Sequence, residues 1–160
     1  MADQKPVGAK PTSSAMAATR AACFPLRFPA EWHDGHADGE FLSSMDFKQP
    51  AGRKAVMAAL NGDAVPLAEL VNTEIAVIGL TCHPATKADE ETGEIVRLIR
   101  CCLHLQDGRV AESFGHGVLK SVRILQTLDG DEMFAKPRRC TVRQIGTGGA
   151  RSMYRLDWLD

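Results

Sequence analysis

The amino-acid sequence predicts a mainly β protein with one or two helices. Between Asn72 and Asp160, short apolar runs of strand length are separated by turn signals such as Asp107-Gly108. One segment of this stretch has the apolar spacing of an amphipathic helix. The elements follow one another as strand, strand, strand, helix, strand and strand, which is the order found in the five-stranded OB barrel. We therefore expect an OB-like barrel (β-β-β-α-β-β) in this part of the chain.

The chain ahead of this barrel differs in composition. Residues 1–19 are rich in Ala, Ser, Thr, Lys and Pro, so they cannot offset the entropy of being ordered and are expected to be disordered. Residues 22–47 carry several aromatic side chains between prolines and glycines, a pattern that argues against regular structure. Residues 1–49 are therefore expected to be an N-terminal extension, and residues 50–160 the OB-like domain.

Two brief helices are expected to lead into the barrel. Residues 52–60 place apolar side chains on one side, with Arg53 and Lys54 exposed, and Asn61-Gly62-Asp63 stops this helix. Pro66 then suits the first turn of a second helix over residues 67–71.

The first two strands are expected over residues 73–82 and 94–105, joined by a loop over residues 84–93. Gly79, in the middle of the first strand, predicts a bulge. In the second strand one face carries Ile99, Cys101, Leu103 and Leu105, and the other carries Arg100, Cys102, His104 and Gln106. Residues 95–98 break this alternation, which favours a second bulge there.

A short strand over residues 109–114, one helix and a closing hairpin complete the expected barrel. The apolar stripe of the helix comprises Val118, Val122 and Leu125, helped by Leu119 and Ile124. The hairpin joins residues 139–145 and 151–159 through the glycines of residues 146–149. In its last strand Tyr154, Leu156 and Trp158 alternate with Arg151, Met153, Arg155 and Asp157, so one face should be core and the other wet.

Composition narrows the function classes. The formal net charge of −1 excludes a globally basic protein, so affinity for phosphate must come from local clustering. No apolar run approaches the roughly 20 residues that span a bilayer, and the N-terminus is not a convincing export signal, so no membrane association is expected. The five cysteines are an odd number without disulfide-framework spacing. We expect buried free thiols and a cytoplasmic location.

The most informative cluster is electrostatic. Six basic residues stand between positions 136 and 155 with no Asp or Glu among them: Lys136, Arg138, Arg139, Arg143, Arg151 and Arg155. On a hairpin, most of them would share one surface, where such a cluster can follow a phosphate backbone. Arg97, Arg100, Lys120 and Arg123 could extend it. Alternatively, surface arginines on a hairpin only solubilise it. Stacking side chains are few, with Tyr154 and His104 as candidates.

Metal binding and catalysis have less support. His33-Asp-Gly-His36 and Cys101-Cys102-Leu-His104 supply donors, but no two ligand pairs have the spacing of a structural zinc site. Residues 146–149 lack the Gly-Lys-Ser/Thr ending of a phosphate-binding loop, and no nucleophile-elbow pattern is present. The chain is therefore not expected to be an enzyme or to require a cofactor.

Several short segments resemble the small single-stranded-DNA-binding (replication) proteins of tailed phages and integrative elements. The resemblance covers about Met57 to Trp158, and its strongest pieces are Asp89-Glu-Glu-Thr-Gly-Glu94 and Ser113-Phe-Gly-His-Gly-Val118. It implies single-strand binding in phage or plasmid replication, with contacts at Arg139, Arg143, Arg151 and Arg155, and at Lys120. The long extension and the cysteine-rich second strand depart from the family. No acidic C-terminal tail of the kind that recruits partners is seen.

Two functions are weighed on this basis. The first is non-sequence-specific binding of single-stranded DNA, with RNA as an option, through Arg100, Lys120, Arg139, Arg143, Arg151, Tyr154 and Arg155. It allows a replication-protein partner and a homo-oligomer. The alternative is a protein–protein interaction module of a phage or mobile element, in which the aromatic segment from Phe24 to Phe47 docks on a host factor.

Overall fold

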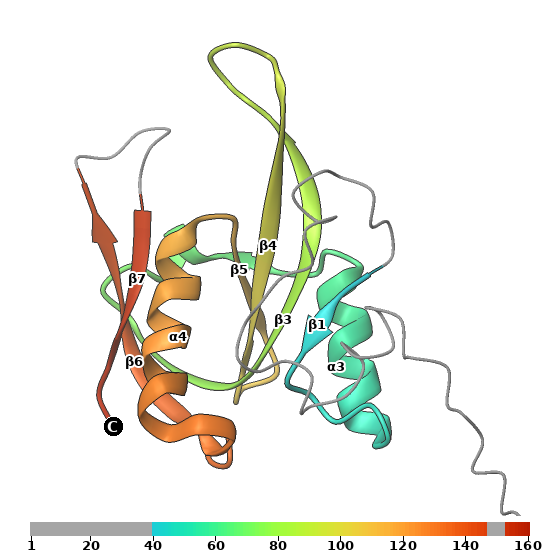
Figure 1. Ribbon diagram of the computed structural model, residues 1–160, viewed down its shortest axis with the longest axis vertical. Coiled ribbons are helices and arrows are strands. Elements are labelled where there is room, and N and C mark those ends of the chain that lie inside the picture. The colour runs from blue at the N-terminus through green and yellow to red at the C-terminus, as the bar shows by residue number, and fades with distance from the viewer. Residues whose placement is uncertain (1–39, 147–152) are drawn as a thin grey trace, which may run out of the picture.

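The computed structural model describes residues 40–146 and 153–160, which form a mixed, seven-stranded sheet curled into a half-barrel with two α-helices (Figure 1). The strands are β1 (Leu42–Ser43), β2 (Val65–Pro66), β3 (Glu74–Ala88), β4 (Ile95–Leu105), β5 (Val110–Ser113), β6 (Arg138–Ile145) and β7 (Met153–Trp158). The α-helices are α3 (Pro50–Leu60) and α4 (His116–Asp129), and the 3-10 helices are η2 (Leu67–Leu70) and η3 (Gly130–Glu132).

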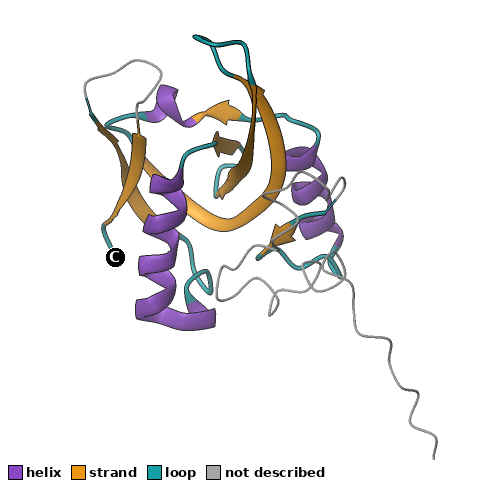
Figure 2. Ribbon diagram, turned by 45° about the horizontal axis from the view of Figure 1, so that its top comes forward, coloured by secondary structure: helices purple, strands orange, loops and turns teal. Residues whose placement is uncertain are grey.

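β3 is the curved strand that joins the two parts of the sheet. The strand order is β2-β5-β4-β3-β6-β7, with β1 paired to β3 off this path. The first residues of β3 pair with β6, and the rest of the strand pairs with β4. The register with β4 shifts between Val77 and Gly79, which confirms the predicted bulge. Such a shift bends a strand, and β3 is the strongly curved strand in Figure 2.

The main core lies between this curved sheet and α4. Val118, Leu119, Val122 and Leu125 of the predicted stripe are buried. Ile124, also assigned to the stripe, is 51% exposed, because it stands one position beyond the face that packs on the sheet. The alternation predicted for β7 is confirmed: Leu156 is buried, Tyr154 and Trp158 pack against the core, and Arg155 is exposed.

The second face of β4 is covered by the lead-in segment. Ala59 of α3 packs with Cys102 and with Val110 of β5 in a second, smaller core. β1 pairs with β3 at Thr81 and Cys82, so residues ahead of position 50 contribute to the sheet. The expectation that this face of β4 carries exposed groups was therefore wrong: Arg100 and His104 are 5% and 3% exposed.

The hairpin of β3 and β4 projects from the body as an arm (Figure 1). The predicted loop over residues 84–93 is shorter in the structure, since β3 continues to Ala88 in unbroken register with β4. The second bulge predicted at residues 95–98 is also absent from that ladder. Both differences from the prediction have one cause. Ile95, Val96 and Arg97 are exposed. Both faces of this part of the hairpin therefore contact solvent, and such a strand need not alternate apolar with polar residues.

The mainly β class and the succession of three strands, one helix and two strands are therefore confirmed from Glu74 to Trp158. The strand count is seven rather than five, because the short strands β1 and β2 precede this succession. Residues 1–39, with the expected disordered arm and most of the aromatic segment, lie outside the described residues. Among the described residues, no helix is long and apolar enough to cross a membrane.

Candidate nucleic-acid interface

Three of the predicted arginines lie on the outer face of β6 and β7. Arg143 stands directly opposite Arg155, and Arg139 lies further along β6 on the same face. Val142 and Leu156 point to the core from the opposite face. The side chains of Arg139, Arg143 and Arg155 are 55%, 48% and 52% exposed, so all three are accessible. We call this set the arginine face.

The fold brings carboxylates to the arginine face from outside the basic stretch of sequence. Arg139 Nε lies 3.1 Å from Asp160 Oδ2, and its Nη1 lies 3.4 Å from Glu74 Oε1. Arg139 also donates its backbone N–H to Asp160, and these contacts hold the pKa of the Asp160 carboxyl below its usual range. The side-chain hydrogen bond to Asp160 raises the pKa of Arg139 in turn.

At the other end of the arginine face, one carboxylate serves two arginines. Asp157 lies 2.8 Å from Arg155 Nε and 3.5 Å from Arg143 Nε. Arg143 also donates from Nη1 to the amide oxygen of Asn72, at 3.0 Å. Exposed ion pairs of this kind contribute little to stability and are screened by salt. The arginines are therefore held in place by contacts that a phosphate could replace.

Two other predicted contact residues, Lys120 and Tyr154, are not on the arginine face. Lys120 is exposed, but α4 packs on the face of β7 that carries Trp158, whose Nε1 donates to Ser121 O. Tyr154 is half-buried on that same side, so it packs against the core and does not present a ring beside Arg155. Arg151 lies outside the described residues.

Arg100 corrects the prediction most clearly, because it is buried. Its Nε donates to Glu112 Oε2 at 2.5 Å, and its Nη1 donates to the carbonyl of Ala59 at the end of α3. Nη1 also lies 3.1 Å from His83 Nε2, which therefore accepts. Burial lowers the pKa of His83, in keeping with a neutral acceptor ring. Arg100 thus ties α3 to β4 and β5, and cannot contact a strand on the surface.

His104, the second stacking candidate, is buried as well. Its Nε2 lies 2.6 Å from Thr81 Oγ1, which in turn bonds to Ser43 of β1 at 2.8 Å. Burial lowers the pKa of His104 to about 4. The ring is a neutral part of the contact between β1, β3 and β4, and is not available for stacking.

The cysteines in the described part of the chain are free and buried, as expected: Cys82, Cys101, Cys102 and Cys140. Burial raises the pKa of Cys102 and of Cys140 to about 12, so neither supplies a thiolate near neutral pH. Within residues 40–146 and 153–160, no group of three or more His, Cys, Asp or Glu side chains is placed to hold a metal ion.

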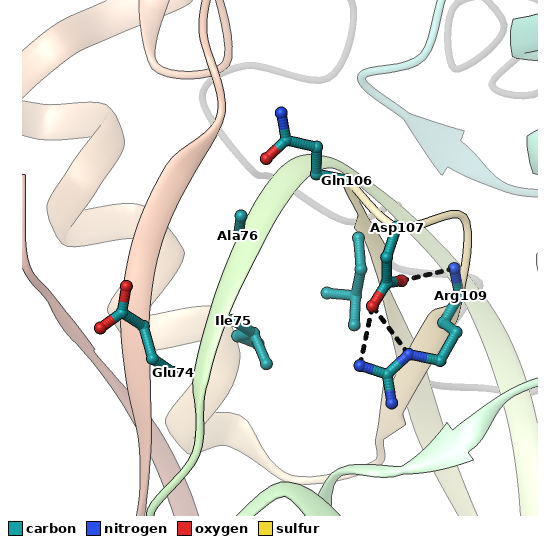
Figure 3. Close-up of a pocket in the computed structure, with 7 residues that line it drawn as sticks. Glu74, Ile75, Ala76, Gln106, Asp107 and Arg109 are labelled. Atoms are coloured by element: carbon teal, nitrogen blue, oxygen red, sulfur yellow. Dashed lines mark hydrogen bonds and ion pairs between the residues drawn. The ribbon is translucent and has the colours of Figure 1, made fainter.

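A surface depression adjoins the arginine face (Figure 3). It lies between the start of β3, at Glu74, Ile75 and Ala76, and the turn from β4 to β5, at Gln106, Asp107 and Arg109. Asp107 accepts from Arg109 in a local ion pair of 2.8 Å. In the sequence, Asp107-Gly108 indicates only a turn, and nothing points to the other side chains of this depression. No motif marks them, since they meet Glu74 only through the fold.

No protein-family model matches this chain, and neither a curated protein nor a solved structure with significant similarity was found. The likeness to phage single-strand-binding proteins therefore stays a prediction from the sequence.

Proposed function

We propose that this protein binds single-stranded DNA, without reading sequence, by holding the phosphate backbone on the arginine face of an OB-like barrel. The observation that supports this proposal best is the position of Arg143 directly opposite Arg155 on an exposed sheet face. Like charges directly opposite each other destabilise a strand pair. Among the described carboxylates, only Asp157 forms an ion pair with these two arginines, so the pair has capacity for a further anion.

The order of the strands supports an OB-like fold. β3 pairs with both β4 and β6, and α4 stands between β5 and β6, as expected for the helix of this barrel. OB barrels commonly bind oligonucleotides on the face of their second and third strands. In this protein those strands are β4 and β5, and α3 covers the face of β4 that carries Cys102. The binding surface is accordingly proposed on β6 and β7.

The charge of the arm also favours a binding surface on β6 and β7. Its tip carries four acidic residues, at positions 89, 90, 91 and 94, and all of them are exposed. A phosphate backbone avoids such a tip and favours the opposite end of the charge distribution. The arginine face offers three accessible guanidinium groups instead.

A salt titration tests the proposal. Labelled single-stranded DNA is titrated with the full chain at several salt concentrations, beside duplex DNA and RNA. We expect log affinity to fall linearly with log salt, and Arg143→Ala and Arg155→Ala each to reduce the slope by about one contact. Arg53→Ala on α3 is the matched control: Arg53 is exposed but remote from β6 and β7, and its removal should leave the slope unchanged. Absence of binding at low salt rules the proposal out.

A second candidate function, protein–protein interaction, is favoured by the arm. Ile95 and Val96 are 68% and 38% exposed beside the acidic tip. The ion pairs among the described residues include none of Glu90, Glu91 and Glu94. Exposed apolar surface rimmed by polar residues can mark a protein–protein interaction site. Replacing residues 89–94 by an Asn-Gly turn should abolish binding of a protein partner and preserve binding of DNA.

A further inference from the structure

The tip of the arm is a hydrogen-bonded turn that presents carboxylates to solvent. Asp89 Oδ1 accepts the backbone N–H groups of Glu91 and Thr92, at 2.8 and 2.9 Å. The backbone N–H of Asp89 donates to Glu94 O at 2.8 Å and closes the turn. The exposed side chains of Glu90, Glu91 and Glu94 therefore extend from a turn that its own contacts hold in shape, so little flexibility is lost when a partner binds them.

Exposed apolar side chains follow the acidic tip directly. Ile95 and Val96, the first two residues of β4, are 68% and 38% exposed and lie on opposite faces of the arm. Lys87 stands opposite Val96 in the ladder, and its ammonium lies 5.7 Å from the centre of the Phe114 ring, which precedes α4. The positive charge of Lys87 is thus directed toward the body, and the tip combines carboxylates with apolar surface.

The arginine face carries the complementary combination. In the ladder of β6 and β7, Ile145 stands directly opposite Met153, two residues beyond the facing pair of Arg143 and Arg155. Side chains two residues apart share a face of a strand, so this apolar pair continues the arginine face. Ile145 and Met153 are 42% and 46% exposed. The same surface therefore offers two guanidinium groups beside two accessible apolar side chains.

One molecule does not bring these two surfaces together. β3 and β4 stay paired in a single register from Gly79 to Ala88, so the arm continues the sheet outward and holds its tip apart from β6 and β7 (Figure 1). The arginine face points away from the core, because Val142 and Leu156 occupy the opposite face of the same strands. A second copy of the chain can supply the partner for each surface.

We propose that the arm of one copy docks on the arginine face of a second copy. The carboxylates of the tip lie against Arg143 and Arg155, and Ile95 packs on Ile145 and Met153. Two copies can exchange arms around a two-fold axis, so that one dimer contains both contacts. A contact confined to a hairpin tip is small, so the dimer should be weak and its affinity should fall with salt.

A docked arm occupies the surface proposed for single-stranded DNA. The self-association does not depend on DNA binding, whereas the competition that follows from it rests on the proposed function. A strand bound to the arginine face must displace the arm, so a saturating oligonucleotide should convert the dimer to monomers.

Sedimentation equilibrium of the full chain without DNA measures the contact. Two charge-reversed chains are compared with the wild type: one carries Arg143→Glu and Arg155→Glu, and the other carries Glu90→Lys and Glu91→Lys. Each should weaken self-association by roughly a hundredfold, because like charges then meet at the contact. An equimolar mixture of the two should restore it, since every arm again faces a surface of opposite charge.

Two further variants separate this contact from a general effect of charge. Asp63→Lys with Glu132→Lys makes the same change in net charge at exposed carboxylates away from the arm, and it should leave self-association as in the wild type. Ile95→Thr keeps a β-branched side chain but removes apolar surface, and it should weaken the dimer several-fold. The urea midpoint of each variant shows that it is folded.

The possible failures are distinguishable. A wild-type chain that stays monomeric at low salt and high concentration contradicts the inference and leaves single-strand binding untouched. Charge-reversed chains that associate like the wild type, or a mixture that fails to restore association, also overturn it. If the dimer forms as expected but a saturating oligonucleotide does not dissociate it, the arm contact stands and DNA binding on the arginine face is wrong.

Discussion

Arg100 is a charged side chain that the fold buries away from solvent. Its three acceptors are Glu112, the carbonyl of Ala59 and His83, while Nη2 is buried and has no partner among the residues that the structure describes. A buried ion pair gains little over an apolar replacement, but removing one partner leaves an uncompensated charge, which is costly. Arg100, which also bonds to the carbonyl of Ala59 in α3, is therefore more important for fixing α3 on the sheet than for net stability.

Glu112→Ala should destabilise the protein for this reason. We expect the free energy of unfolding to fall by about 2–3 kcal/mol, below the roughly 3–5 kcal/mol of a fully buried pair, because Glu112 is partly exposed. Urea denaturation measures the change. Asp107→Ala breaks an ion pair whose two side chains are half exposed, and it should change the midpoint little. Equal effects of the two substitutions would contradict a special role for the buried pair.

The sequence could not distinguish Arg100 from Arg143. Each arginine alternates with apolar residues along a strand, and this pattern predicts a wet face for both. Arg143 does lie on a solvent-exposed face of its strand, whereas α3 covers the face of β4 that carries Arg100. The alternation of apolar and polar residues indicates that the two faces of a strand differ in polarity. It does not report that a helix from earlier in the chain will cover the more polar one.

At the scale of elements, the close contact of α4 with β7 depends on a glycine. A Cβ on Gly117, in the first turn of α4, would lie 2.1 Å from the backbone oxygen of Tyr154. The helix can approach the strand this closely only because no side chain intervenes. On the same two elements, Ser121 Oγ accepts from the backbone N–H of Leu156 at 3.0 Å, a bond that needs this approach.

Gly117→Ala should therefore displace α4 from β7. We expect the free energy of unfolding to fall by about 1–3 kcal/mol, as for overpacked cores, and the loss to be measurable as a lower urea midpoint. Gly115→Ala is the matched control two residues earlier. Among the described atoms, its Cβ would meet only Ser113 Oγ at 3.9 Å, an ordinary contact, and no comparable loss is expected. A stable Gly117→Ala variant would show that the helix has room to shift.

The type of each element was easier to predict than its end. The apolar stripe of α4 and the bulge at Gly79 follow from side-chain spacing, which buried packing imposes on a sequence. β3 continues to Ala88 beyond the body of the domain. The end of the arm is exposed there, so the spacing of apolar residues does not predict where the strand ends. β1 and β2, with two residues each, are too short to leave any period.

For the molecule as a whole, net charge conceals the arrangement of charges. The chain carries a formal net charge of −1. Its charges are nevertheless separated on the surface, with acidic residues at the tip of the arm and the arginine face on β6 and β7. The carboxylates that meet Arg139 and Arg155 come from β3, β7 and the C-terminal residue. Sequence clustering thus grouped Arg139, Arg143 and Arg155 correctly, but it also included Arg138, which lies on the other face of β6 and pairs with Asp129 at 2.9 Å. It did not predict which acids join the arginine face.

Low pH should destabilise the whole fold because it protonates the His83 and His104 rings. Burial beneath α3 and β1 keeps both rings neutral in the folded protein. The pKa of His104 is about 4 in the folded protein against about 6.5 when exposed, and burial also lowers the pKa of His83. Between these two pKa values the unfolded chain binds more protons, so the stability present near pH 7 is lost as the pH falls through 6.5 toward 4. Contacts with Arg109 and Arg139 lower the pKa of Asp107 and of Asp160, and these carboxyls affect stability only near and below the usual Asp pKa of 3.8, outside this window.

From pH 7 to pH 5 we therefore expect the free energy of unfolding to fall by about 2 kcal/mol from His104 alone, measured by urea denaturation at both pH values. His104→Gln should flatten this dependence, because an amide can bond to Thr81 but does not titrate. His116 is exposed at the start of α4, and His116→Gln should leave the pH dependence as it is in the wild type. If His104→Gln keeps the full loss, the neutral ring beneath β1 is not what makes the fold sensitive to acid.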